Sequence, residues 1–250
     1  MSTLRVIVRR ELLRLFGAPT AWVVLGALQF LSAYLFFIHL EDFLLQQEKL
    51  RAAGGTVGLS AYVIPRFFMP LSGLLLFIAP LLSMNLIAGE RSGGTLRLLL
   101  SAPVSAVVIV LGKYLATLCL LTLALILVAL MPLILGFWVA IDPGALLLAL
   151  LGTWLCAALG LALGLFFSAL AGHPGIAAVA AFTVLIILWL VGQVEGTELT
   201  ATTRFISLPH HLHAFYSGLL DTRDLAYFAI AIALCLAAGA KQLAGRRESP

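Results

Sequence analysis

The sequence predicts an all-α integral membrane protein with six transmembrane helices, an amphipathic interfacial helix at the N-terminus and a short cytosolic helix after the second span. Three observations predict this class. Of the 250 residues, 62% are hydrophobic and 10% are charged, the mean hydropathy is +1.13, and uncharged apolar runs recur along the chain. Soluble domains carry about 25% charged residues. The composition therefore leaves no room for a sizeable soluble domain, and residues 1–250 are expected to form one transmembrane domain.

The first element is a predicted helix over residues 2–16 that lies in the inner membrane interface. Its leucines and isoleucine fall near one face and its arginines near another, a pattern typical of interfacial helices. The arginines are Arg5, Arg9, Arg10 and Arg14. A secretory signal peptide is the alternative, but the following apolar run is too long and no small-residue cleavage site follows it cleanly.

Six later stretches are predicted to span the bilayer, because a spanning helix needs roughly 20 apolar residues. The uncharged run over residues 143–194 is too long for one helix, and the sequence AGHPG at residues 171–175 divides it. The last stretch is short, and Lys241 extends it by reaching to the interface. The predicted spans cover about residues 22–40, 68–88, 114–136, 145–167, 175–194 and 225–244.

The distribution of basic residues predicts that both termini are cytoplasmic. Cytoplasmic loops carry an excess of Lys and Arg. With the N-terminus inside, ten of the fifteen Lys and Arg residues fall on inner segments and five on outer ones. The net charge of +4 thus matches a membrane surface with its lipids, and we expect no nucleic-acid partner.

Small and sulfur-containing residues inside the spans indicate packing. Gly160 and Gly164 lie four apart, a spacing that lets helix backbones approach closely. Packing within one subunit is favoured over a dimer contact. Cys119, Cys156 and Cys235 lie in apolar runs, and their spacing is neither a zinc pattern nor a disulfide framework.

Residues 89–114 form the longest polar interruption on the predicted cytosolic side. Glu90 and Arg91 keep its start in water, and a glycine pair ending at Gly94 permits a sharp turn. Thr95 can cap a short helix, and Pro103 ends or redirects it. The leucines of this helix are Leu96, Leu98, Leu99 and Leu100. A stiff, exposed element joined to two spans suits a membrane protein that is pushed by a soluble partner.

The chain lacks the motifs of an enzyme or of an ion-coupled carrier. Gly112 and Lys113 are followed by Tyr114 rather than Ser or Thr, and no Gly-rich turn precedes them, so this is not a nucleotide-binding loop. If the protein uses ATP, another chain binds it together with Mg²⁺, and we expect no cofactor in this chain. No carboxylate lies in the middle of a span, which disfavours a secondary transporter. Lys113 is either an anchor at the interface or part of the polar loop's site.

A histidine-rich segment, PHHLH at residues 209–213, is the one place with metal chemistry on offer. His210, His211 and His213 could bind copper or zinc. No Cys, Met or acid stands beside them, and a metal site needs a supporting shell, so solvated or hydrogen-bonded histidines are favoured. A Ser207–His–Asp221 hydrolase is disfavoured because no oxyanion motif accompanies it.

The polar segment over residues 89–114 resembles the segment after the second membrane helix in ABC-2-type transporter permeases. The family pattern is an acid and a base, Gly-Thr, a Leu-rich short helix, a Ser/Pro turn, and Gly-Lys on the next helix. The matching residues are Glu90, Arg91, Gly94, Thr95, Leu98, Leu99, Leu100, Pro103, Ser105, Gly112 and Lys113. Residues 207–228 look like the gliding-motility branch, to which the permease of nitrous-oxide-reductase maturation is related.

The resemblance implies the permease subunit of an ATP-driven exporter, which is not itself an enzyme. A second permease, identical or different, would pair with it, and a dimer of cytosolic ATPases would dock on the pair. About residues 95–101 would be the coupling helix, and the N-terminal helix would neighbour the ATPase. Two alternatives stay open: a non-transporting scaffold that drives assembly or transmits force to periplasmic partners, and a permease that delivers metal or sulfur.

Overall fold

The described part of the chain is built from α-helices alone. The computed structural model describes residues 3–52, 58–96, 104–139, 141–191 and 205–248, and no strand occurs among them. This confirms the predicted all-α class. The helices are α1 (Thr3–Gly17), α2 (Pro19–Ala52), α3 (Leu59–Ser83), α4 (Ala88–Ser92), α6 (Ala106–Leu135), α7 (Pro143–Leu170), α8 (Pro174–Leu190), α10 (Leu208–Tyr216) and α11 (Thr222–Glu248).

Within the described residues, five helical segments are long and apolar enough to cross a membrane, so the chain is a multi-pass membrane protein. They are Pro19–Gln47, Ser60–Ser92, Ala106–Leu135, Pro143–Leu170 and Thr222–Arg246. The sixth predicted span, residues 175–194, corresponds to α8, which is apolar but has 17 residues. A straight crossing needs about 20. The structure thus supports five spans by length and leaves the sixth a prediction.

Capping residues set two helix starts before the predicted ones. The third span was expected to begin near residue 114, but α6 begins at Ala106, where the Ser105 hydroxyl accepts a hydrogen bond from the Val108 amide. Asp142 accepts from the Gly144 amide and starts α7, with Pro143 in its first turn. Side-chain oxygens at this position satisfy amides that have no partner within the helix.

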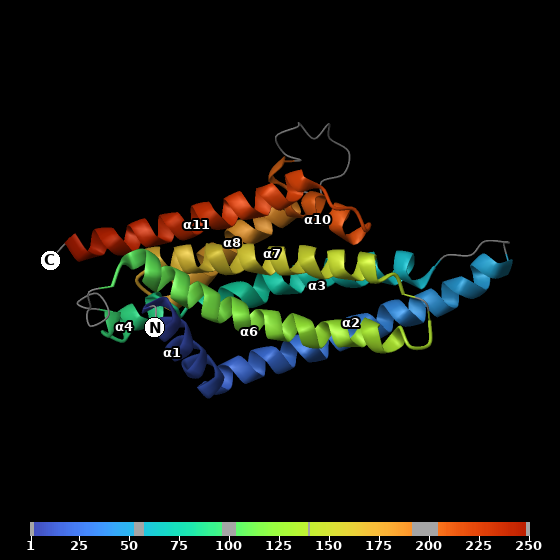
Figure 1. The fold of residues 1–250 in the computed structure, drawn as a ribbon, viewed down its shortest axis with the longest axis horizontal. Coiled ribbons are helices and arrows are strands. Elements are labelled where there is room, and N and C mark those ends of the chain that lie inside the picture. Colours follow the sequence, from blue (N-terminus) through green and yellow to red (C-terminus); the bar gives the residue numbers. More distant parts are fainter. Residues whose placement is uncertain (1–2, 53–57, 97–103, 140, 192–204, 249–250) are drawn as a thin grey trace.

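The helices form an elongated bundle with α7 at its centre (Figure 1). α7 packs against α3, α6, α8, α10 and α11, whereas α1 packs mainly on α6. Both ends of the chain lie near α4, at what we call the α4 end (Figure 1). α10 lies toward the opposite end, which we call the α10 end.

Two glycines of α7 explain its close approach to α3. A Cβ at Gly160 would stand 2.8 Å from the Ala79 Cβ, and one at Gly164 would stand 1.8 Å from the Ser83 Oγ. Both distances are too short for any larger residue without a shift of the helices. The expectation that these glycines pack within one subunit is confirmed.

A third glycine sets the position of α1. A Cβ at Gly112 on α6 would stand 2.6 Å from Ile7 Cγ2 on α1, so glycine is what lets these two helices touch here. α1 is present close to the predicted bounds, and its arginines Arg5, Arg9 and Arg10 are exposed. Its place in a membrane interface stays a prediction.

Candidate functional site

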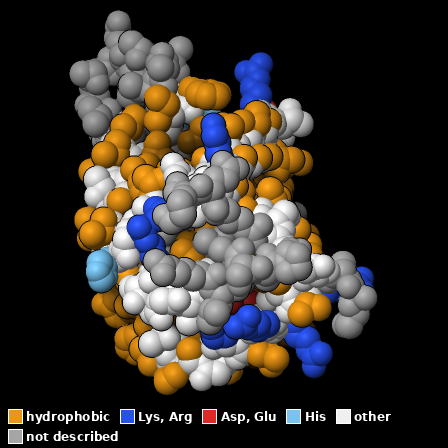
Figure 2. Space-filling model, turned by 90° about the vertical axis from the view of Figure 1, so that its left-hand side faces the viewer, with side chains coloured by type: hydrophobic (Ala, Val, Ile, Leu, Met, Phe, Trp, Pro, Cys, Tyr) orange, Lys and Arg blue, Asp and Glu red, His pale blue; other side chains and the backbone are white. Residues whose placement is uncertain are grey.

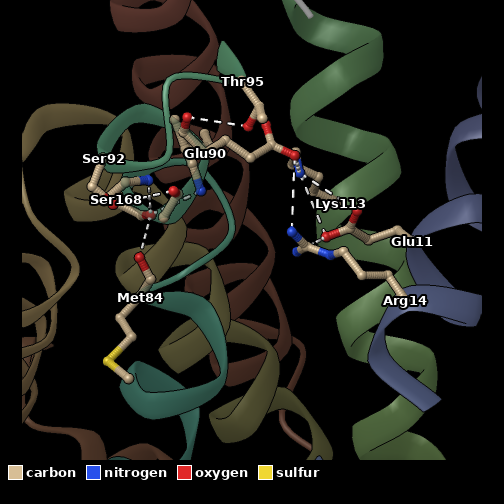
Figure 3. A network of polar contacts seen from close by, with 11 residues as sticks. Glu11, Arg14, Met84, Glu90, Ser92, Thr95, Lys113 and Ser168 are labelled. Carbon is tan, nitrogen blue, oxygen red and sulfur yellow. Dashed lines mark hydrogen bonds and ion pairs between the residues drawn. The ribbon is translucent and has the colours of Figure 1, made fainter. Parts of the chain in front are cut away.

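The site begins at the joint between α3 and α4, which a serine of α7 holds in place. The Ser168 hydroxyl donates to the Met84 carbonyl (2.8 Å) and accepts from the amides of Ile87 (3.1 Å) and Ala88 (3.0 Å) (Figure 3). The first amides of a helix have no partner within it. Ser168 therefore supplies the cap of α4 from another helix, and it fixes where Glu90 lies.

Lys113 of α6 is buried against two carboxylates. Its Nζ lies 2.7 Å from Glu90 Oε1 and 3.5 Å from each carboxylate oxygen of Glu11 (Figure 3). The exposed fraction of the side chain is 2% for Lys113, 7% for Glu11 and 17% for Glu90. The sequence left two interpretations of Lys113, an anchor at the membrane interface or a part of the polar loop's site. The arrangement favours the polar loop's site, because the amine points inward to Glu90 and does not reach the surface.

Arg14 of α1 completes the group, which we call the ionic cluster: Glu11, Arg14, Glu90 and Lys113. Arg14 hydrogen-bonds Glu11, and its Nη1 lies 3.9 Å from Glu90 Oε1. Two cations thus face two anions, and the cluster is neutral as a whole. Removing one member of a buried ion pair leaves an uncompensated charge, which costs about 3–5 kcal/mol. Glu90 Oε2 is buried and has no hydrogen-bond partner within the described residues.

The turn after α4 needs a glycine. Gly94 has φ +72°, in the left-handed region that glycine adopts without strain. The exposed Thr95 donates its hydroxyl hydrogen to the Glu90 carbonyl (3.2 Å), and Leu96 is buried. Leu98, Leu99, Leu100 and Pro103 lie outside the described residues, so the body of the predicted coupling helix stays a prediction.

Arg91 points away from the ionic cluster and contacts the end of α7. Its guanidinium donates to the Ala171 carbonyl (3.2 Å), while Arg246 of α11 donates to the Leu170 carbonyl (2.9 Å). The last carbonyls of a helix lack partners within it and attract cations. α4 is therefore linked to α7 both at its start, by Ser168, and within its length, by Arg91.

The α4 end is rich in basic side chains. Figure 2 views this end directly: Lys and Arg side chains gather on it, while the flanks of the molecule are mostly hydrophobic. Of the four arginines singled out in the N-terminal helix, the structure brings only Arg14 into the ionic cluster. Arg5, Arg9 and Arg10 are exposed.

Sequence reasoning missed Glu11 and Ser168. Glu11 stands four residues after Ile7 and four before Leu15, which places it on the apolar face of α1. A lone acid on that face is a signal for a buried cation. Ser168 gave no comparable signal, because its role depends on how α7 packs against the α3–α4 joint.

The three histidines do not converge in the structure. His211 is buried, with Nδ1 2.7 Å from Asp224 Oδ1 and Nε2 2.9 Å from the Phe205 carbonyl oxygen. His210 and His213 are exposed. No group of three His, Cys, Asp or Glu side chains within the described residues is arranged for a metal ion. Neither nitrogen of His211 faces Ser207, and its carboxylate partner is Asp224 rather than Asp221, so the hydrolase arrangement is absent there.

Comparison with known proteins agrees with this fold. The long apolar helices of the described residues define a multi-pass membrane protein. The model of the family described as ABC-2 family transporter protein matches residues 6–239. The chain therefore belongs to the ABC-2 family and is the membrane component of an ABC transporter. A search of curated proteins found no match.

Proposed function

We propose that the chain is the permease subunit of an ATP-driven exporter in the bacterial inner membrane. In this proposal the ionic cluster passes the motion of a cytosolic ATPase to the spans. The observation that carries it is the position of Lys113 Nζ, which bridges Glu90 of α4 and Glu11 of α1 from within α6. Three helices from separate parts of the sequence thus meet at one buried amine.

The contacts connect α4 to α6, α1 and α7, so a force on α4 can pass to these helices. A push on the segment after α4 reaches Glu90, whose pairing with Lys113 carries it to α6 and, through Glu11, to α1. Ser168 carries it from the start of α4 to α7. Packed elements shift as bodies between discrete arrangements rather than deforming continuously. The cluster and Ser168 therefore make the α4 end move as one unit.

The distribution of charge supports a cytosolic α4 end. α1, α4, the start of α6 and the end of α11 lie on this side (Figure 1), which fits the excess of Lys and Arg in cytoplasmic segments. These segments carry Arg5, Arg9, Arg10, Arg14, Arg91, Lys113, Lys241 and Arg246. In the assembly that we propose, an ATPase dimer docks here beneath two paired permeases, and both termini face the cytosol. A thiol at position 95, in a chain without its native cysteines, should react with an impermeant reagent from the cytosolic side only. Reaction from the periplasmic side would contradict this orientation.

The function is tested with the full chain and its partner ABC ATPase, purified together in nanodiscs. We expect wild-type permease to bind the ATPase and raise its rate of ATP hydrolysis. Glu90→Ala should lower that stimulation, because it leaves Lys113 without its closest partner. Glu41→Ala, the same change at an exposed glutamate of α2, is the matched control. Full stimulation by Glu90→Ala, or no ATPase bound to wild type, would refute the proposal.

A further inference from the structure

α10 is a short helix wedged into the bundle toward the α10 end. It packs against α7, α3 and α8, with Leu208, Leu212 and Phe215 fully buried. A Cβ at Gly152 of α7 would stand 2.7 Å from the Phe215 Cβ, so the two helices are in close contact. Two separate sets of polar contacts hold α10, and only one of them contains a group that gains or loses a proton near neutral pH.

The first set surrounds the buried His211. Its Nε2 lies 2.9 Å from the Phe205 carbonyl oxygen, which can only accept, so this nitrogen carries a hydrogen. Its Nδ1 lies 2.7 Å from Asp224 Oδ1. If Asp224 is ionised, Nδ1 must also carry a hydrogen, and the ring is an imidazolium.

The position of Asp224 favours the ionised form. Asp224 is in the first turn of α11, where the positive end of the helix dipole stabilises a carboxylate. The His211 ring also stacks on the Tyr227 ring, with centroids 4.0 Å apart and planes 16° apart. In the proposal that follows, His211 carries the shared proton, and the pair is a hydrogen-bonded imidazolium and carboxylate.

We propose that His211 and Asp224 form a proton-dependent latch that holds the first half of α10 against α11. When the imidazolium gives its proton to solvent, one ring nitrogen turns a lone pair toward an acceptor, either the carboxylate or the Phe205 carbonyl. One of the two hydrogen bonds is then replaced by repulsion. A rise in pH on this side of the membrane therefore loosens α10, and acid fastens it.

The second set of contacts is independent of pH. The Tyr216 hydroxyl, at the end of α10, bonds the Ser72 hydroxyl of α3 and the Thr153 hydroxyl of α7. Hydroxyl groups do not change charge in the range where histidine does. The end of α10 stays attached while its first half is released, so the movement is a hinge about Tyr216.

Among the residues that the structure describes, few other ionisable groups lie around His211. α11 brings Tyr227 beside Asp224, with the exposed Arg223 next to it and the exposed Asp221 just before the helix, and α10 brings His210, whose ring centroid is 5.8 Å away. From α7 the one ionisable side chain is Cys156. α8 has none, and those of α3, Tyr62 and Arg66, contact each other. Of the described side chains in this region, histidine is thus the type whose ordinary pKa lies near neutral pH.

Spin-label distances test the latch in the full chain, with native cysteines changed to alanine and the protein in nanodiscs. One label replaces the exposed His213 of α10 and the other the exposed Leu147 of α7. Between about pH 5 and about pH 9, where histidine titrates, we expect one distance in acid and a second, longer distance that grows as the pH rises. A distribution that stays the same over this range would overturn the proposal.

Asp224→Asn is the decisive variant. Its amide can donate to Nδ1 while Nε2–H still donates to the Phe205 carbonyl, so the latch should hold at every pH with a neutral ring. His211→Ala should give the longer distance at every pH. Asp221→Asn, the same change at the exposed aspartate just before α11, is the matched control and should leave the response to pH in place. An Asp224→Asn protein that responds to pH as wild type does would refute the latch, whether or not His211→Ala folds.

Discussion

Lys113 Nζ lies 2.7 Å from Glu90 Oε1, and the lysine side chain is 2% exposed. Lys113→Met keeps most of the apolar stem but leaves Glu11 and Glu90 buried with only Arg14 to balance them. We expect the free energy of unfolding to fall by about 3–5 kcal/mol, measured by thermal and denaturant unfolding in micelles. Lys241→Met, at an exposed lysine of α11, should change little.

The double variant Lys113→Met with Glu90→Gln separates charge from packing. It leaves Glu11 and Arg14 as a neutral pair, so most of the lost stability should return. If the double variant is as unstable as the sum of the two single ones, the pairing of Lys113 with Glu90 is not what stabilises this end.

Gly112 is predicted to be required for the close packing of α1 on α6. Gly112→Ala would place a methyl group 2.6 Å from Ile7 Cγ2, and such overpacking costs about 1–3 kcal/mol. The expected result is a lower unfolding temperature and faster proteolysis of α1. Gly26→Ala on α2 has open space around it and is the control. Equal behaviour of the two variants would argue against close packing of α1 on α6.

Ser168→Ala should weaken the α3–α4 joint. The change leaves the buried amides of Ile87 and Ala88 without their acceptor, at a cost of about 1–3 kcal/mol. Hydrogen exchange at these two amides should accelerate. Thr183→Ala removes an exposed hydroxyl that bonds a carbonyl of its own helix, and it should have little effect. Unchanged exchange in Ser168→Ala would mean that α4 is held by other contacts.

The helices could largely be predicted from the sequence because a lipid-embedded backbone must satisfy its hydrogen bonds within a helix. The missed start of α6 has a physical reason. The charge of Lys113 predicts that the polar loop extends to this residue. Its pairing with Glu90 and Glu11 instead lets a charged residue lie inside α6. α8 is apolar as expected, and its 17 residues fall short of the predicted span.

The site was predictable only in part. Glu90, Arg91 and Lys113 stood out as polar residues flanking a loop, and Gly94 as a turn residue. The contacts between them depend on α1 and α7, which lie far away in the sequence. Ser168 looks like any small residue in an apolar run. That His211 pairs with Asp224 rather than with Asp221 depends on the orientation of α10.

The most direct test of the central claim measures ATP hydrolysis by the permease–ATPase complex that carries both Lys113→Met and Glu90→Gln. This variant should fold and bind the ATPase, because no buried charge is left unpaired. It should nevertheless fail to stimulate hydrolysis, because the connection from α4 to α6 and α1 is gone. Stimulation equal to that of wild type, in a complex of normal composition, would contradict a role for the ionic cluster in coupling.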